Sequence, residues 1–187
     1  MQILLSRGPG PASTLELAEV PEPRPGPGEV RIAVAACAIN YPDALIIEDR
    51  YQLRPARPFA PGAEVAGVVD AVGEGVSRLR LGDRVIGMPA YGGLAEKLVL
   101  AADRCVPIPD GAPLDEAAAL LMTFGTALYG LKTRGGLRAG ERLLVLGAAG
   151  GVGLAAVEIG KQLGAEVIAA ASSEAKAATA PQATPIT

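Results

Sequence analysis

The feature that most constrains the fold is a glycine-rich turn between two apolar segments. Residues 143–147 form a continuous apolar run, LLVLG, and the turn that begins at its last glycine reads GAAGGVG. The segment LAAVEIGKQLG follows, with apolar residues at helical spacing, and residues 167–171 form a second apolar run. Continuous apolar runs of this length are typical of buried parallel strands. The order strand, glycine turn, helix, strand is that of the first unit of a doubly wound parallel sheet.

The glycine turn has the chemistry of a pyrophosphate site. Its glycines follow the spacing Gly-x-x-Gly-x-x-Gly, one residue longer than the usual dinucleotide-binding pattern. Small residues let backbone N–H groups approach a phosphate, and the helix N-terminus supplies the positive end of a dipole. The alternative is a tight structural turn. We predict that the turn binds a dinucleotide through Gly147, Ala148, Ala149, Gly150, Gly151, Val152 and Gly153.

The residues after the second apolar run favour NADPH over NADH. A site for NAD usually places an acidic residue about 20 positions beyond the first glycine, where it holds the ribose 2′-hydroxyl. Here that region is all alanine, and Ser172, Ser173 and Lys176 follow it, with Glu174 among them. Two hydroxyls and a cation suit a 2′-phosphate, although a serine here also suits the N-cap of a helix.

The composition excludes several kinds of catalytic site. The 187 residues contain no histidine and two cysteines, and the formal net charge is −3. A Ser-His-Asp triad and every histidine-ligated metal site are therefore excluded, and a zinc site would need several carboxylates. We expect the chemistry to come from a bound cofactor. Without a basic excess we expect no nucleic-acid partner, and without a long apolar run or secretion signal we expect a cytoplasmic protein with no membrane span.

The chain divides into a β-rich front and a region that begins with helices. Short β-favouring runs separated by Gly, Pro and Asp turns predict strands at 2–5, 29–36, 65–72, 84–88, 96–100 and 105–108. Many short strands with frequent turns favour a barrel or a sandwich. From Pro113 to Arg134 the pattern is helical, and Gly135-Gly136 is a stop signal. Another helix is expected from Ser172.

Several segments resemble a known family. PGPGEVRIAVAACAINYPD, PFAPGAEVAGVVDAVGEGVSRLRLGDRVIGM and DEAAAL resemble the GroES-like catalytic domain of medium-chain dehydrogenases/reductases. VLGAAGGVGLAAVEIGKQLGAEVIAAASS resembles the cofactor domain of the zinc-free quinone oxidoreductase branch, the zeta-crystallin relatives. The resemblance implies a GroES-like β-barrel domain over residues 1–122 and an incomplete Rossmann-type β-α-β unit over 123–187, a C-terminally truncated form of the family, with an irregular tail at 179–187. It also implies that full-length relatives are homodimers.

The resemblance also assigns site residues. The zinc-dependent branch has a cysteine ligand where this chain has Asn40 and a histidine ligand where it has Ala63, so no metal is expected and Glu64 is expected to be structural. In the quinone oxidoreductase branch, the matching asparagine and nearby tyrosines line the nicotinamide and substrate pocket. By resemblance, the candidate catalytic residues are Asn40, Tyr41 and Tyr51, and Asn40 and Thr126 are candidates for the nicotinamide side of the cofactor site. Packing in the core or in a turn is the alternative for each.

The implied activity is NADPH-dependent reduction of a quinone without a metal. An enone or a 2-enoyl thioester would also accept hydride, so an enone/2-enoyl reductase of the same superfamily is the first alternative. A non-catalytic GroES-like binding module, or a fragment, is the second. Two strands and one helix enclose a dinucleotide poorly, so we expect the 187-residue chain itself to bind NADPH weakly and to turn over slowly.

Overall fold

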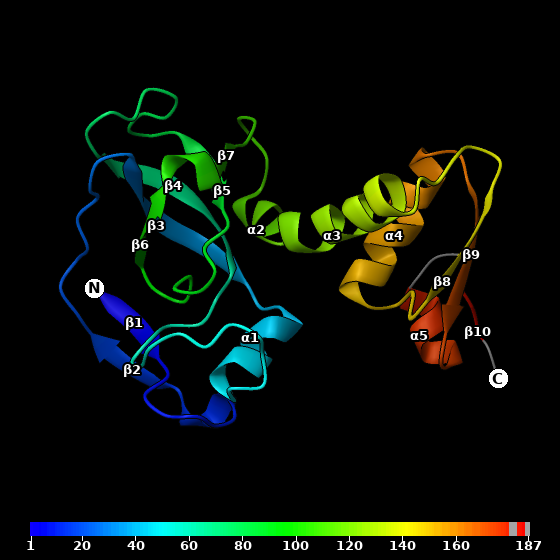
Figure 1. The fold of residues 1–187 in the computed structure, drawn as a ribbon, viewed down its shortest axis with the longest axis horizontal. Coiled ribbons are helices and arrows are strands. Elements are labelled where there is room, and N and C mark those ends of the chain that lie inside the picture. The colour runs from blue at the N-terminus through cyan, green and yellow to red at the C-terminus, as the bar shows by residue number, and fades with distance from the viewer. Residues whose placement is uncertain (180–182, 186–187) are drawn as a thin grey trace. The chain divides into compact units, whose positions relative to one another are not determined.

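The computed structural model describes residues 1–179 and 183–185, and it divides into two compact units. The first unit is Met1–Ala119 and the second is Leu120–Thr187 (Figure 1). The division lies three residues before the boundary predicted from the sequence. Each unit has its own sheet and its own apolar core.

The first unit is built on a five-stranded antiparallel sheet. Its order is β6-β3-β4-β5-β7, from β3 (Glu29–Ala38), β4 (Glu64–Val72), β5 (Arg84–Gly87), β6 (Lys97–Ala101) and β7 (Cys105–Pro107). A separate antiparallel pair joins β1 (Gln2–Leu5) to β2 (Glu16–Glu19). All six predicted strands are confirmed, with small shifts at their ends. The strand β2 was missed, because its sequence ELAE is mostly exposed and gives no apolar alternation.

Short helices complete the first unit. They are the 3-10 helices η1 (Ala12–Thr14) and η2 (Ala102–Arg104) and the α-helices α1 (Tyr41–Ile47) and α2 (Leu114–Ala118). The core is formed mainly by alternate residues of neighbouring strands, such as Val30 and Ile32 of β3 and Val65 and Val69 of β4, all essentially without solvent exposure. This period of two places one face of each strand against the core.

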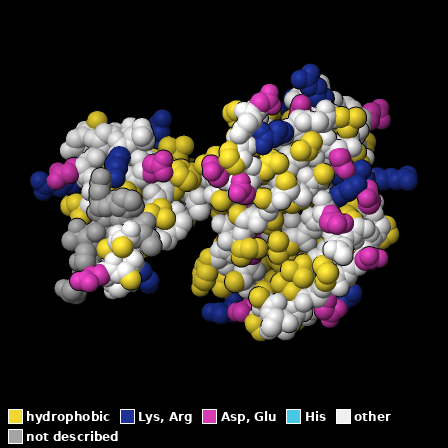
Figure 2. Space-filling view, turned by 180° about the vertical axis from the view of Figure 1, so that it is seen from behind, with side chains coloured by type: hydrophobic (Ala, Val, Ile, Leu, Met, Phe, Trp, Pro, Cys, Tyr) yellow, Lys and Arg dark blue, Asp and Glu magenta, His cyan; other side chains and the backbone are white. Residues whose placement is uncertain are grey.

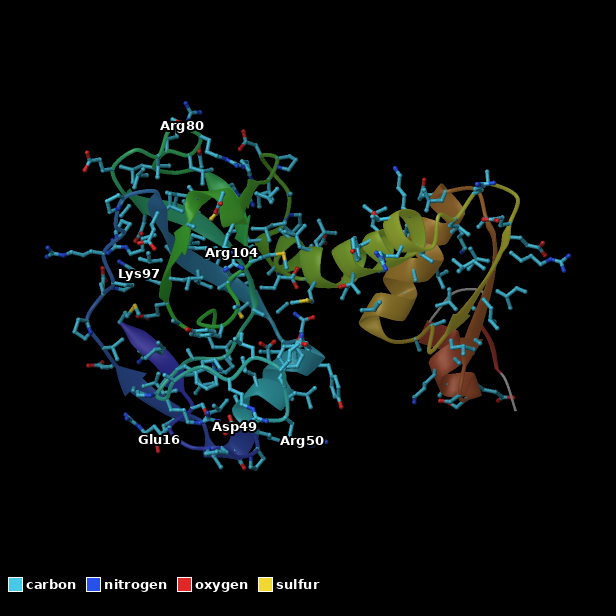
Figure 3. The ribbon with its side chains drawn as sticks, in the orientation of Figure 1. Glu16, Asp49, Arg50, Arg80, Lys97 and Arg104 are labelled. Atoms are coloured by element: carbon cyan, nitrogen blue, oxygen red, sulfur yellow. The ribbon has the colours of Figure 1, made fainter. Side chains whose placement is uncertain are left out.

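Ion pairs lie on the surface of this sheet. Lys97, labelled in Figure 3, lies 2.7 Å from Glu22 and 3.3 Å from Asp70, and Arg31 lies 2.7 Å from Asp70. Burial raises the pKa of the Asp70 carboxyl, but the hydrogen bonds from Arg31 and Lys97 outweigh it and hold this pKa below its ordinary value. The hydrogen bond from Lys97 likewise lowers the pKa of Glu22. On the face shown in Figure 2, basic and acidic side chains of the larger unit lie interspersed.

The second unit contains a three-stranded parallel sheet of order β10-β9-β8. Its elements are η3 (Leu121–Gly125), α3 (Thr126–Leu128), η4 (Tyr129–Arg134), β8 (Arg142–Leu146), α4 (Gly151–Gln162), β9 (Glu166–Ala171), α5 (Glu174–Thr179) and β10 (Ala183–Pro185). The predicted order of strand, glycine turn, helix and strand is confirmed. The helical segment before β8 is confirmed too, although η3 and η4 have the wider turns of π-helices.

The tail differs from the irregular segment expected at 179–187. Thr179 is the last residue of α5, and Ala183–Pro185 pairs in parallel with β9. The apolar positions Ala169–Ala171 of β9 provide the strand edge with which this short strand pairs. The rest of that expectation, at 180–182 and 186–187, lies outside the described residues.

The expected parallel strand at residues 143–147 is confirmed, but the expectation that it is buried is wrong for one of its two faces. Leu143 and Val145 pack with the α4 residue Val157, but Leu144 and Leu146 are 55% and 71% exposed. Successive side chains of a strand point to opposite faces, and α4 covers only the face that carries Leu143 and Val145. The apolar run therefore forms a strand with one face covered by α4 and the other exposed to solvent.

No helix in the part of the chain that the structure describes combines the length and the apolar character that crossing a membrane requires.

Candidate functional site

The glycine turn connects β8 to α4 by a backbone that a larger residue would distort. Gly147 has φ of +66°, in the left-handed region that favours glycine. The Ala148 N–H donates to the carbonyl of Ala170 at 2.9 Å, which ties the turn to β9. A Cβ on Gly153 would lie 2.3 Å from the carbonyl oxygen of Gly147. The fold therefore requires glycine at position 153 and favours it at position 147.

Gly150 is different, because the fold does not require a glycine there. It is the N-cap of α4 with φ of −84°, a conformation open to any residue. A Cβ at this position would meet only the carbonyl oxygen of Gly147, at an ordinary contact distance of 3.5 Å. Its bare backbone leaves room at the helix N-terminus, which is where a phosphate is bound in dinucleotide sites. The local geometry thus fits a nucleotide cofactor and is more than a tight turn needs.

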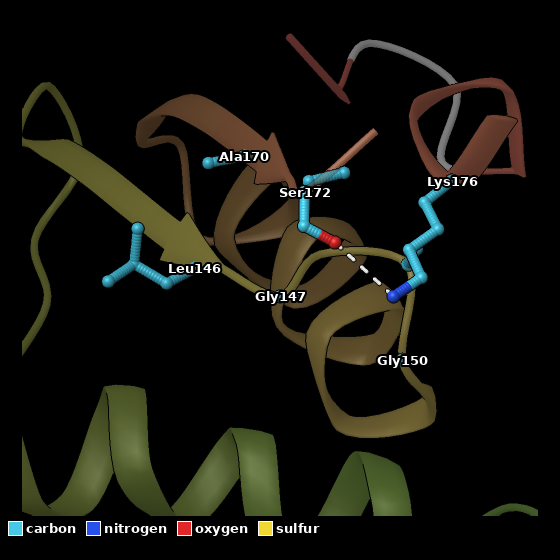
Figure 4. A pocket seen from close by; sticks show the side chains of 8 residues that line it. Leu146, Gly147, Gly150, Ala170, Ser172 and Lys176 are labelled. Carbon is cyan, nitrogen blue, oxygen red and sulfur yellow. Dashed lines mark hydrogen bonds between the residues drawn. The ribbon is translucent and has the colours of Figure 1, made fainter. Parts of the chain in front are cut away.

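A pocket of about 590 Å³ opens beside the turn (Figure 4). This volume is in the range of small-molecule sites. Lys176 Nζ donates to Ser172 Oγ at 3.2 Å, so two of the three residues proposed for the 2′-phosphate meet in the pocket. The third, Ser173, accepts a hydrogen bond from the Lys176 backbone at 3.4 Å, as expected at the start of α5. The lining consists of Leu146, Gly147, Ala149, Gly150, Ala170, Ala171, Ser172 and Lys176.

Not all predicted cofactor residues line this pocket. Ala148 is completely buried, and neither it nor the first turn of α4, Gly151–Gly153, is among the lining residues. Thr126 is exposed in α3 and is not among the lining residues either. Leu146, Ala170 and Ala171 line the pocket but were not predicted from the sequence. The signal for them was their place at the carboxyl ends of parallel strands, where ligands bind in open α/β sheets.

In the first unit, two buried carboxylates hold Asn40 at the start of α1. The Asn40 backbone N–H donates to Asp43 Oδ2 at 2.8 Å, and its side-chain Nδ2 donates to Glu64 Oε2 at 3.2 Å. Glu64 is completely buried and Asp43 is 6% exposed. Asp43 was not predicted. The spacing Asn-x-x-Asp before an apolar segment, which is a capping-box pattern, was the signal for it.

The same carboxylate fixes the segment before β4. Asp43 Oδ1 accepts a hydrogen bond from the Gly62 N–H at 3.0 Å. Gly62 has φ of +100°, and a Cβ there would lie 2.8 Å from Cys37 Sγ, so this position also requires glycine. The motif Gly62-Ala63-Glu64 is therefore packed against β3, and α1 is linked to it through Asp43.

The two candidate tyrosines lie in different surroundings. Tyr41, the first residue of α1, is 76% exposed. Tyr51 is half-buried and packs against the cluster of Ile46, Ile47 and Phe59, the packing alternative named above. Neither observation tests a catalytic role, and both assignments stay predictions.

The two cysteines lack the environment of reactive thiols. Burial raises the pKa of Cys37 to about 12, and the charges of Asp43 and Glu64 act in the same direction. Burial also raises the pKa of Cys105 to about 11. A thiol must ionise to act as a nucleophile, so both are weakly reactive near neutral pH. Within residues 1–179 and 183–185, no group of three or more Cys, Asp or Glu side chains is placed to hold a metal ion.

Comparison with known proteins supports the division of the chain into two units. Residues 26–110 match the alcohol dehydrogenase GroES-like domain. Quinone oxidoreductase-like protein 2 of Bos taurus is 43% identical over 147 residues, which are 78% of this chain and 42% of that protein. The quinone oxidoreductase of Rattus norvegicus is 39% identical over 142 residues, 75% of this chain and 43% of that protein. The chain thus spans about two-fifths of the length of these curated relatives.

Solved structures agree in fold. The Escherichia coli quinone oxidoreductase complexed with NADPH superposes with a TM-score of 0.93 at 30% identity, over all of this chain and 58% of that one. The CurK enoyl reductase gives a TM-score of 0.86 at 35% identity, over 94% of this chain and 55% of that one. A GroES-like domain followed by a β-α-β unit with a glycine turn defines the medium-chain dehydrogenase/reductase class. The chain belongs to this superfamily, in its quinone oxidoreductase branch.

Proposed function

We propose that this chain carries the catalytic domain and the pyrophosphate-binding turn of an NADPH-dependent quinone oxidoreductase that needs no metal. The observation that supports it best is the pocket beside the glycine turn, where the unhindered Gly150 backbone lies near the Ser172–Lys176 pair. Relatives named as quinone oxidoreductases, one of them solved with NADPH, support the same activity.

The first turn of α4 and the residues that line the pocket divide the binding of the cofactor between them. The backbone N–H groups at the start of α4 bind the pyrophosphate, with the helix dipole in their favour. Lys176 and Ser172 bind the 2′-phosphate, the cation by charge and the hydroxyl by hydrogen bonding. In this proposal the alanines at 169–171 matter as well, because no carboxylate stands where it would repel that phosphate.

The first unit binds and orients the reacting groups. Bound NADPH supplies the hydride. Asn40 hydrogen-bonds a carboxamide or a quinone carbonyl, and Tyr51 and Tyr41 donate to the developing oxyanion or stack on the flat ring. A reduced quinone is a stabilised anion that water protonates, so no histidine or other strong side-chain acid is needed. The small-molecule partner we propose is therefore a quinone.

Reduction of an enone or a 2-enoyl thioester is the second candidate. The likeness to the CurK enoyl reductase favours it, with sequence identity similar to that of the quinone oxidoreductase structures. An enone accepts hydride at carbon and leaves a more basic enolate than a reduced quinone. Protonation would then need a positioned donor, and Tyr41 and Tyr51 are the candidates among the predicted residues.

The deciding experiment compares acceptors and cofactors. We expect the chain, extended through a complete cofactor domain of a close relative, to oxidise NADPH with a simple quinone, and to prefer NADPH over NADH. The 187-residue chain alone should give a rate near background. Turnover with 2-enoyl thioesters but not with quinones would favour the second candidate. No NADPH binding by either chain would contradict both.

A further inference from the structure

The Glu64 side chain is completely buried and is hydrogen-bonded to Asn40. It begins β4, has no solvent exposure, and receives the hydrogen bond of Asn40 Nδ2 at 3.2 Å. We propose that Glu64 is a positioning residue, whose carboxylate selects which end of the Asn40 amide faces the reacting groups. This inference rests on the proposed function, which places Asn40 at the reaction site.

The selection follows from the donors and acceptors of the two groups. An asparagine amide has a donating NH₂ end and an accepting oxygen end, and rotation by half a turn exchanges them. An ionised carboxylate only accepts hydrogen bonds, so it stabilises the orientation in which Nδ2 faces Glu64. The amide oxygen then faces away from Glu64, toward the Asp43 N–H, its partner in the capping box at the start of α1. Because an amide oxygen has two lone pairs, it can also accept a hydrogen bond from an N–H donor of a nicotinamide carboxamide.

The surrounding backbone is fixed independently of Glu64. Asp43 binds the Asn40 backbone N–H and the Gly62 N–H with its two oxygens, and the Asp43 N–H donates to the Asn40 carbonyl at 2.9 Å. These backbone contacts hold the Cα of Asn40 without the Glu64 side chain. Glu64 and the Asp43 N–H contact opposite ends of the Asn40 amide, so Glu64 adds to the control of the side-chain torsions of Asn40. Replacing its carboxylate should thus disturb the amide more than the fold.

The sequence makes this measurable, because Asn40 is the only asparagine in the chain. Labelling of the 187-residue chain with ¹⁵N-asparagine therefore gives one side-chain NH₂ group in an NMR spectrum. In Glu64→Gln, the new amide can present either an oxygen or an NH₂ group to Asn40, so the preference is lost while the shape is kept. We expect the Nδ2 protons to exchange with water about tenfold faster, because a hydrogen bond to a charged acceptor is lost.

Two further variants separate positioning from structure. Glu74→Gln changes the same residue type at an exposed turn and should leave the Asn40 amide unchanged. Glu64→Asp keeps a carboxylate, and we expect it to recover part of the protection. Thermal unfolding is recorded for each variant. A fall in the unfolding temperature of Glu64→Gln without a change in amide exchange would show a purely structural role and overturn the proposal.

The functional consequence is measured as a separation of kcat from KM. In the extended chain used to test the proposed function, Glu64→Gln should lower kcat for quinone reduction about tenfold and leave the KM for NADPH within about twofold, because the phosphate-binding residues are unchanged. Unchanged kcat would overturn the positioning role even if the amide exchange rises. If the unsubstituted extended chain shows no turnover, the proposed function fails, and the exchange measurement alone decides whether Glu64 orients Asn40.

Discussion

The two units are stabilised by different kinds of packing. In the first, apolar residues of the five-stranded sheet pack together in a buried core. Two buried carboxylates hold the candidate residue Asn40 in place. In the second, the three-stranded sheet has one face covered by α4 and another on which Leu144, Leu146 and Ile168 are exposed. The position of Asn40 therefore depends on tertiary packing. The glycine turn depends mainly on local backbone geometry, which explains how it forms on so small a sheet.

The largest expected effect tests this contrast in packing. We expect Ile32→Ala, in the core of the first unit, to lower the free energy of unfolding by about 2–5 kcal/mol, because it leaves a cavity. Leu144→Ala, on the open face of β8, should change it by no more than about 0.5 kcal/mol. Urea unfolding of the two variants checks the difference. A large loss with Leu144→Ala would mean that this face is covered in solution.

Local patterns predicted the elements well, and long-range contacts account for what was missed. The strand β8 and the helix α4 could be predicted because periodicity and glycine spacing are properties of neighbouring residues. The exposure of Leu146 could not, since it depends on what covers the second face of the sheet. The bond from Asn40 to Glu64 spans 24 residues and joins two elements, and no local pattern marks it.

The next effect concerns cofactor choice in the second unit. In the extended chain, Lys176→Ala should weaken NADPH binding by about 1.5–3 kcal/mol, roughly ten- to a hundredfold, because a charged contact to the 2′-phosphate is lost. NADH has no such phosphate and should bind nearly as before. Titration of both cofactors measures this, with Lys161→Ala, on the last turn of α4, as the control. Equal weakening of NADPH and NADH by Lys176→Ala would remove this residue from the role.

A smaller effect is the pH dependence of stability that Asp70 gives to the first unit. The folded-state pKa of Asp70 is lowered, so its contribution to stability is present above the unfolded pKa of about 4 and is lost as pH falls through the folded pKa. Asp70→Asn should cost about 1 kcal/mol at pH 7, as partly exposed ion pairs do, and nothing additional once the carboxyl is protonated. Urea unfolding at pH 7 and near pH 3 measures the difference, with Asp103→Asn as the control. An equal cost at both pH values would contradict an electrostatic origin.

The smallest expected change in stability falls on the glycine that the fold does not require. Ser is at least as good an N-cap as Gly, so Gly150→Ser should alter the free energy of unfolding by no more than about 0.5 kcal/mol. Its side chain would nevertheless occupy the space beside the N-terminus of α4, and NADPH binding by the extended chain should weaken. Gly153→Ala is the matched variant: its Cβ would meet the Gly147 carbonyl oxygen, and we expect a loss of about 1–3 kcal/mol. Calorimetry for stability and fluorescence titration for NADPH distinguish the two effects. If Gly150→Ser binds NADPH as tightly as the original chain, the turn is structural and the pyrophosphate lies elsewhere.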